Sequence, residues 1–229
     1  MKYLRVYPNH QSLFNNPSDK KINISVCEDG PEVHYGLKLY DAKIGYLEST
    51  GTQYINSGYR LWTSSITIET EMAFTDLTVN RSIEGAADAF YYGINNKRYE
   101  TAYQNYWGTT DTNFHTFKKT LTKSSNKFIA QTWIDGISRY NSTSTSINTA
   151  IRSYITLFGT SSSSEVGENF SVAGYLKCRK ISFKLIIDEE VVRDMIPVRK
   201  GNIGYMYDKV SGQLFGNSGT GSFTLGPDI

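Results

Sequence analysis

Glu69 and Glu71 are the residues of this sequence whose type and spacing could most readily do chemistry. On a β-strand, residues i and i+2 point to the same face and lie about 6.5–7 Å apart. Two carboxylates at that separation can serve as the acid and base of a glycoside hydrolase. The glutamates also alternate with Ile68 and Met72, and a strand with one buried face carries solvated polar residues on the other. A hydrolase site and an exposed strand face both stay open, and the alternation favours the exposed face.

The other reactive side chains are isolated from one another. His10, His34 and His115 do not have the spacing of metal ligands. Cys27 and Cys178 are far apart, which favours two free thiols over a disulfide framework or a zinc site. There is also no phosphate-binding loop and no nucleophile motif. The sequence therefore predicts a protein that is not an enzyme and that holds no metal and no cofactor.

Composition excludes several classes of protein. The 229 residues include 24 Lys and Arg against 22 Asp and Glu, a formal net charge of +2, which argues against a nucleic-acid partner. Aromatic residues make up 14% of the chain, enough to build a core. No apolar run reaches the ~20 residues of a membrane helix, and the first residues do not resemble a signal peptide. We expect a soluble protein, made in a cytoplasm, without membrane insertion.

Strand periodicity dominates the sequence from Ile44 onward. Polar and apolar residues alternate in 66–74, and 127–134 places Phe128, Ala130 and Ile134 on one face against Ile129, Gln131 and Trp133 on the other. The segments 154–158 and 175–187 predict further strands. In the last segment the residues expected to share one face are Ile181, Phe183, Leu185 and Ile187. Turn residues at Asp135-Gly136 and at 208–212 predict hairpins. Short strands with polar turns predict an antiparallel sandwich, barrel or jelly roll.

One segment fits two structures. The apolar residues Val191, Val192, Met195 and Ile196 match a helical stripe as well as a strand. Pro197 has no backbone N–H, so we expect it to end whichever element forms there.

The first part of the chain has a different pattern. Residues 22–27 and 32–35 alternate around Glu28-Asp29-Gly30, which predicts a β-hairpin. This segment is too small to carry its own core, so it should lean on another surface. We therefore divide the chain into an attachment or oligomerisation segment at 1–43 and one domain at 44–229.

Two blocks of sequence resemble a known family. They are YLESTGTQYINSGY at 46–59 and the run at 186–226 that contains RDMIPV and YDKVSGQLFGNSGTGSF. In combination they resemble the laminin-G-like, concanavalin A-like jelly-roll modules of bacteriophages and of surface proteins of gut bacteria. The hairpin segment is similar to leader segments of virion fibre and decoration proteins in phages of gut Bacteroidales, including crAss-like phages. The resemblance implies an all-β, antiparallel two-sheet jelly-roll sandwich with an N-terminal extended arm and β-hairpin.

Exposed aromatic residues are the candidate contact residues. Sugar sites combine aromatic side chains with a few polar groups, and Tyr also provides large contact area between proteins. Seven aromatic residues lie in loop-like or variable segments, namely Tyr59, Trp62, Tyr91, Tyr92, Tyr103, Tyr106 and Trp107. We expect them to contact a glycan or a partner, and many other tyrosines to belong to the core.

The favoured interpretation is a phage virion structural protein, either a capsid-decorating head fibre or a tail-fibre component. It is expected to be a homo-dimer or homo-trimer, to attach to capsid or tail proteins through residues 1–43, and to display its jelly roll toward cell-surface or mucus glycans. One alternative is a carbohydrate-binding module of a bacterial surface protein. The other is a glycoside hydrolase that uses Glu69 and Glu71. Glucanases of the wider fold resemble an E-x-D-x-x-E pattern, and this sequence departs from it because the next acidic residue is Asp76.

Overall fold

The computed structural model describes residues 39–60, 65–78, 82–86, 90–95, 98–101, 105–108, 110–124, 127–145, 154–161 and 172–229. These residues belong to one compact unit, Lys38–Ile229. The predicted hairpin at 22–35 lies outside the described residues, as does most of the segment 1–43. The division into 1–43 and 44–229 therefore stays a prediction.

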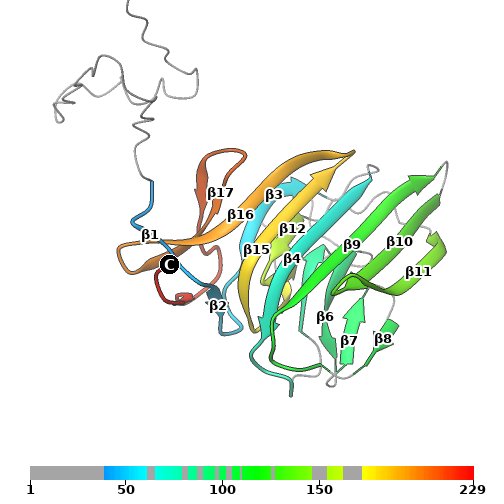
Figure 1. The fold of residues 1–229 in the computed structure, drawn as a ribbon, viewed down its shortest axis with the longest axis horizontal. Coiled ribbons are helices and arrows are strands. Elements are labelled where there is room, and N and C mark those ends of the chain that lie inside the picture. The colour runs from blue at the N-terminus through cyan, green and yellow to red at the C-terminus, as the bar shows by residue number, and fades with distance from the viewer. Residues whose placement is uncertain are drawn as a thin grey trace, which may run out of the picture. The chain divides into compact units, whose positions relative to one another are not determined.

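Two β-sheets form the described unit, and Figure 1 shows the strands of one in front of those of the other. The large sheet has 11 strands within the described residues. In hydrogen-bonded order, its main path is β11 (Ile137–Thr145), β10 (Lys127–Ile134), β9 (His115–Ser124), β4 (Ile66–Phe74), β15 (Cys178–Ile187), β16 (Glu190–Lys200), β17 (Ile203–Asp208) and β18 (Gln213–Phe215). Three short strands pair beside this path, β1 (Ala42–Lys43) with β16, β2 (Leu47–Ser49) with β15, and β19 (Thr224–Leu225) with β2.

The small sheet has 8 strands within the same residues. Its main path is β14 (Val172–Tyr175), β13 (Gly159–Ser161), β5 (Ser82–Ala86), β6 (Phe90–Asn95), β7 (Arg98–Thr101) and β8 (Asn105–Trp107). The strand β12 (Tyr154–Leu157) pairs with β3 (Ile55–Arg60) and with β5. The described pairings are antiparallel except that of β13 with β5, which is parallel.

The core lies between the two sheets. Ile68 and Phe74 of β4, Leu185 of β15 and Leu157 of β12 are at most 1% exposed. Each such side chain contributes roughly 1.5–3 kcal/mol when it is fully buried. The described residues contain no helix, and the all-β two-sheet sandwich, one of the architectures that the alternation allowed and the one that the resemblance implied, is confirmed.

The predicted turns are present. Asp135 and Gly136 join β10 to β11 with φ angles of 51° and 74°, which are the positive values of a type I′ hairpin turn. Residues 208–212 connect β17 to β18, where the Gly212 N–H donates to the Asp208 carbonyl at 2.8 Å. Both hairpin predictions are confirmed.

The prediction that Pro197 ends its element is wrong. Strand β16 runs from Glu190 through Pro197 to Lys200, so the helical alternative at 191–196 does not form. The Pro197 carbonyl accepts a hydrogen bond from the Ile44 N–H at 3.2 Å, on the side of the short strand β1. The N–H and C=O of a strand residue point the same way, so the missing N–H removes no hydrogen bond from the ladder with β17.

The predicted face of β15 is wrong at Ile181, because the strand contains a β-bulge there. The register with β4 shifts between Lys180 and Ser182, so Ile181 is an extra residue in the strand. Phe183 and Leu185 are buried as predicted. Ile181 is only partly buried, and the side chain of Lys180 is buried on the inner face in its place. Alternation alone cannot show this, because an inserted residue exchanges the two faces of a strand.

The buried Lys180 forms an ion pair between the sheets. Its Nζ lies 2.8 Å from Glu84 Oε1 of β5, and both side chains are fully buried. Lys180 Nζ also donates to Thr70 Oγ1 at 2.9 Å, and Glu84 Oε2 accepts the Phe158 N–H at 2.8 Å. A buried ion pair is tolerated when further hydrogen bonds satisfy both charges, as they do here.

The two sequence blocks that carry the family resemblance meet in space. The Ser218 N–H donates to the Tyr54 carbonyl at 2.8 Å, and the Thr220 N–H donates to the Thr52 carbonyl at 3.0 Å. Between them the buried Gln53 side chain accepts the Thr50 N–H at 2.8 Å and donates to the Thr220 carbonyl at 3.2 Å. The blocks therefore close the domain by joining its beginning to its end.

Gln53→Ala is expected to lower the free energy of unfolding by about 1–3 kcal/mol, because it removes the buried side-chain oxygen that accepts the Ser49 hydroxyl at 3.1 Å and the Thr50 N–H at 2.8 Å. Equilibrium unfolding in urea measures this loss. The exposed Gln213→Ala serves as the matched control and should change the free energy by less than about 0.5 kcal/mol. Equal effects of the two substitutions would refute the closing role of Gln53.

Candidate functional site: a polar groove on the large sheet

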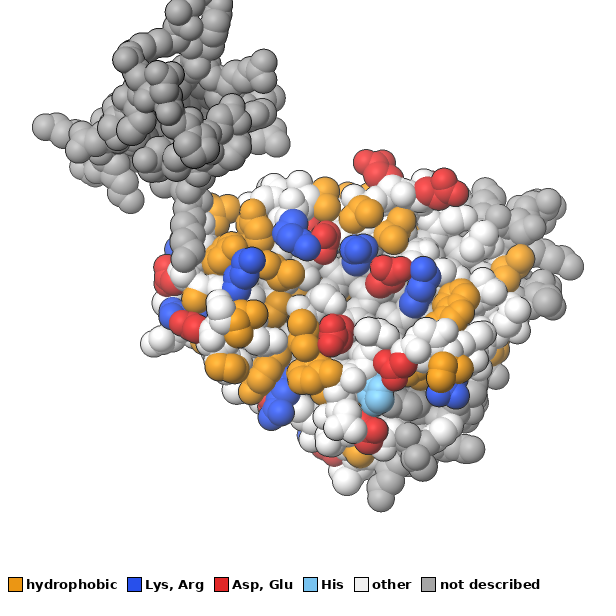
Figure 2. Space-filling view, viewed as in Figure 1, with side chains coloured by type: hydrophobic (Ala, Val, Ile, Leu, Met, Phe, Trp, Pro, Cys, Tyr) orange, Lys and Arg blue, Asp and Glu red, His pale blue; other side chains and the backbone are white. Residues whose placement is uncertain are grey.

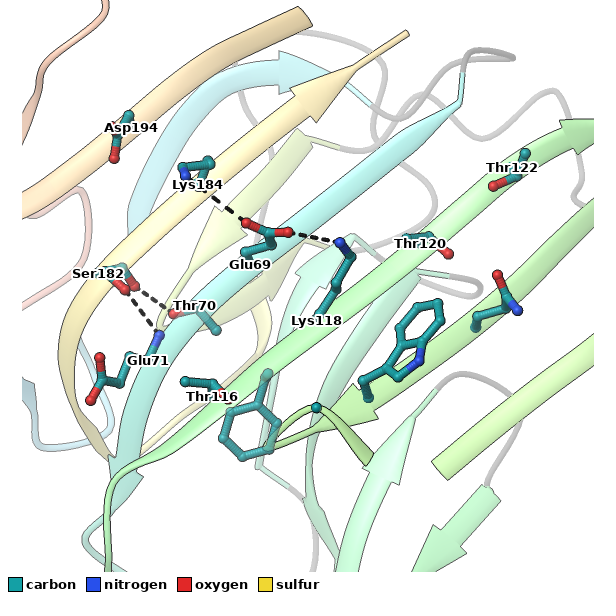
Figure 3. Close-up of a pocket in the computed structure, with 14 residues that line it drawn as sticks. Glu69, Thr70, Glu71, Thr116, Lys118, Thr120, Thr122, Ser182, Lys184 and Asp194 are labelled. Atoms are coloured by element: carbon teal, nitrogen blue, oxygen red, sulfur yellow. Dashed lines mark hydrogen bonds and ion pairs between the residues drawn. The ribbon is translucent and has the colours of Figure 1, made fainter. Parts of the chain in front are cut away.

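A groove lies on the outer face of the large sheet, over β10, β9, β4, β15 and β16. Its volume is about 850 Å³. The outward residues of these strands alternate with the core residues of the inner face, which is why this face is polar. Figure 2 shows acidic and basic side chains interspersed on it, and Figure 3 shows the groove in close-up.

Charged side chains of opposite sign lie at the middle of the groove. Glu69 is on β4, between Lys118 of β9 and Lys184 of β15 (Figure 3). Lys118 Nζ lies 2.9 Å from Glu69 Oε1, and Lys184 Nζ lies 4.0 Å from Glu69 Oε2. These groups are more than a third exposed, so the pairs contribute less than about 1 kcal/mol to stability. They place hydrogen-bond donors and acceptors next to one another in the groove.

Hydroxyl groups surround the charged centre. They belong to Thr116 and Thr122 of β9 and to Ser182 of β15. The Ser182 hydroxyl accepts the Glu71 N–H at 3.1 Å, which places it beside the second glutamate of the sequence motif (Figure 3). A hydroxyl can both donate and accept, so these side chains suit a ligand that carries hydroxyl groups itself.

Trp133 and Gln131 complete the lining from β10. In the strand register they lie opposite Lys118 and Thr120 of β9. The sequence assigned them to the face opposite Ala130, which is buried, and that assignment is confirmed. It did not identify them as contact residues. The signal was available, because a tryptophan on the solvated face of a strand has no part in the core.

The described members of the predicted contact set lie elsewhere. Tyr59 is on β3 of the small sheet, and the Arg193 guanidinium lies over its ring, 4.6 Å from the centroid. Tyr91 and Tyr92 belong to β6, and Tyr106 and Trp107 to β8 of the same sheet, whereas the groove is on the large sheet. Trp62 and Tyr103 lie outside the described residues. The contact role of these seven residues stays a prediction.

The carboxylates of the hydrolase hypothesis share a face, as predicted. Glu69 and Glu71 both line the groove, on the side of β4 opposite Ile68 and Met72. Asp76, the next acidic residue, does not line it and pairs with Lys177 at 2.8 Å instead. The hydrogen bonds from Lys177 and Thr78 hold the pKa of Asp76 well below its usual value. The groove thus presents two glutamates on one face and lacks the third acid of the glucanase pattern.

A histidine with two carboxylates lies at one end of the groove, next to Thr116. His115 Nδ1 lies 2.6 Å from Asp135 Oδ2, and His115 Nε2 lies 3.0 Å from Asp111 Oδ1. Burial alone lowers the pKa of His115, but the hydrogen bonds to both carboxylates outweigh it and leave the pKa raised. The pKa of Asp111 is lowered, mainly by its hydrogen bond with His115. The imidazole links the 111–114 loop to the β10–β11 turn.

Because the pKa of His115 is raised on folding, its stabilisation is complete below the unfolded pKa of about 6.5 and is lost as the pH rises through the folded pKa. Relative to His115→Gln, we expect the native chain to lose less than about 1 kcal/mol of unfolding free energy between pH 5.5 and pH 8.5, since both carboxylates are about half exposed. Urea unfolding at the two pH values tests this. A native chain that gains stability over His115→Gln at the higher pH contradicts the assignment.

The described residues offer neither a cluster of metal ligands nor a helix that could cross a membrane. Within the described residues, no three His, Cys, Asp or Glu side chains are grouped so that they could hold a metal ion. Cys178 is a free buried thiol, and burial raises its pKa. No helix able to cross a membrane occurs in the part of the chain that the structure covers.

Comparisons with known proteins place the fold. No model of a known protein family matches the chain, and no curated protein does. Among solved structures, the chain is similar to a candidate carbohydrate-binding protein from Bacteroides ovatus, with a TM-score of 0.50 and 11% sequence identity. The match covers 81% of this chain and 60% of that protein, so the chain spans less than two thirds of its length. At this identity the similarity shows a shared β-sandwich fold.

Proposed function

We propose that the domain binds carbohydrate and that the groove on the large sheet is its binding site. The observation that carries the proposal is the lining of the groove, where Trp133 stands among hydroxyl, amide and charged side chains. The flat indole can lie against the face of a sugar ring, and the polar groups can bond its hydroxyls. The similar fold of the Bacteroides ovatus protein, which is described as a candidate carbohydrate-binding protein, supports the same function.

We further propose that the chain is a structural protein of a phage virion, as a capsid-decorating head fibre or a tail-fibre component. The support is the resemblance of the blocks at 46–59 and 186–226, and of the segment 22–35, to phage modules. In this proposal residues 1–43 attach a homo-dimer or homo-trimer to capsid or tail proteins. Many copies on one particle then convert weak single contacts with a glycan surface into firm adhesion.

Two measurements on the full chain test these proposals separately. A glycan array tests binding, and the proposal expects retention of at least one polysaccharide without release of sugar. Mass spectrometry of purified virions tests location, and the proposal expects the chain among the particle proteins. Binding by a monomer that is absent from particles would indicate the module of a bacterial surface protein. Sugar release that disappears in Glu69→Gln/Glu71→Gln would indicate the hydrolase.

A further inference from the structure

We infer that the ligand of the groove is an uncharged glycan that crosses the strands of the large sheet. The inference rests on the proposed function and names the chemical class of the ligand. Its basis is a single row of side chains, one from each of five neighbouring strands. In order the row consists of Trp133, Lys118, Glu69, Lys184 and Asp194.

The row is continuous because its members are direct cross-strand partners. Trp133 pairs with Lys118, and Glu69 pairs with both Lys118 and Lys184. Lys184 also pairs with Asp194. Paired residues of an antiparallel sheet project from the same face, so all five project outward. Neighbouring strands are about 4.8 Å apart, so four spacings make a row of about 19 Å, the length of several sugar rings.

The charges along the row compensate one another. Glu69 lies 2.9 Å from Lys118 and 4.0 Å from Lys184, and Asp194 lies 2.7 Å from Lys209. The lining of the groove holds three carboxylates (Glu69, Glu71, Asp194) and two ammonium groups (Lys118, Lys184), and Lys209, outside the lining, pairs with Asp194, so the groove has no excess of positive charge. Each of the three ammonium groups, those of Lys118, Lys184 and Lys209, therefore lies within 4.0 Å of a carboxylate.

This pattern discriminates between ligand charges. An anionic polymer would meet the carboxylates of the row as well as its lysines, and it would gain little from the release of counterions. The hydroxyl of a neutral sugar can donate to Glu69 or Asp194 and accept from Lys118 or Lys184. A neutral chain that lies along the row therefore finds a partner at each strand, and Trp133 offers its indole to one ring at the end of the row.

Affinity electrophoresis of the full chain tests the inference, with dextran, mannan, xylan and β-1,3-glucan as neutral probes and polygalacturonate and heparin as acidic ones. We expect retardation by at least one neutral probe, with less than a twofold change in apparent Kd between about 20 and 300 mM NaCl. Preference for an acidic probe, or loss of neutral binding in salt, overturns the inference while the proposed function stands. Retardation by none of the probes overturns the proposed function as well.

The variant Glu69→Gln provides a second test of the inference, because it leaves Lys118 and Lys184 without the carboxylate that they share. We expect it to raise the affinity for polygalacturonate about fivefold at low salt, the effect of one charge at about 4 Å in water. Glu190→Gln removes the same charge from an exposed position outside the groove and should leave the affinity unchanged. Equal gains in the two variants overturn the role given to Glu69.

Discussion

Lys180→Met is expected to lower the free energy of unfolding by about 3–5 kcal/mol, because it leaves the buried Glu84 carboxylate without its cation. Domains of this kind are stable by about 5–15 kcal/mol, so the loss is a large part of the total. The melting temperature should fall by roughly 6–20 °C. Calorimetry and urea unfolding both measure the effect.

Two further variants separate the charge from the packing. Lys180→Met with Glu84→Gln removes both charges while an amide oxygen can still accept the Phe158 N–H, so we expect part of the stability to return. Lys184→Met, on the same strand but partly exposed, should change the stability by less than about 0.5 kcal/mol. If Lys180→Met costs no more than Lys184→Met, the ion pair does not hold the two sheets together.

Trp133→Ala is expected to weaken glycan binding at least tenfold, about 1.4 kcal/mol, while the fold is retained. The side chain lines the groove and is not part of the buried core, so its removal takes contact area from the ligand and little from the protein. Calorimetric titration with an oligosaccharide of the best neutral probe measures the loss, and circular dichroism verifies the fold.

A matched aromatic control is available on the other sheet. Tyr175 of β14 is 36% exposed and lies away from the groove. Tyr175→Ala should leave the affinity within about twofold of the native value, within the range of ordinary surface substitutions. Loss of binding in Tyr175→Ala with full binding in Trp133→Ala would move the site from the large sheet to the small one.

Local patterns of the sequence predicted much of the fold. The alternation in β4 and β10 gave the correct buried faces, and the turn residues Asp135 and Gly136 gave the hairpin between β10 and β11. The bulge at Ile181 could not be predicted, because it depends on the buried partner that Lys180 finds on another sheet. The continuation of β16 through Pro197 likewise depends on the tertiary structure, because the side of Pro197 that lacks an N–H faces the short segment at Ile44 and not β17.

The groove could be predicted only in part. The sequence placed Glu69 and Glu71 on one exposed face, and the structure confirms that placement. It could not show that β4 lies between β9 and β15, which are distant in the sequence, and so it could not bring Lys118 and Lys184 to Glu69. Exposed aromatic residues were expected in loop-like segments, whereas Trp133 lies in the middle of a strand face.

Mapping of amide chemical shifts by NMR during titration with a neutral oligosaccharide tests the central claim most directly. The account predicts that the shifts gather on β9, β10 and β4, and that they include the indole N–H of Trp133, which a Trp133→Phe sample identifies. Shifts that gather instead on β6 and β8, around Tyr91 and Tyr106, would show that the ligand binds the small sheet and would contradict the assignment of the groove.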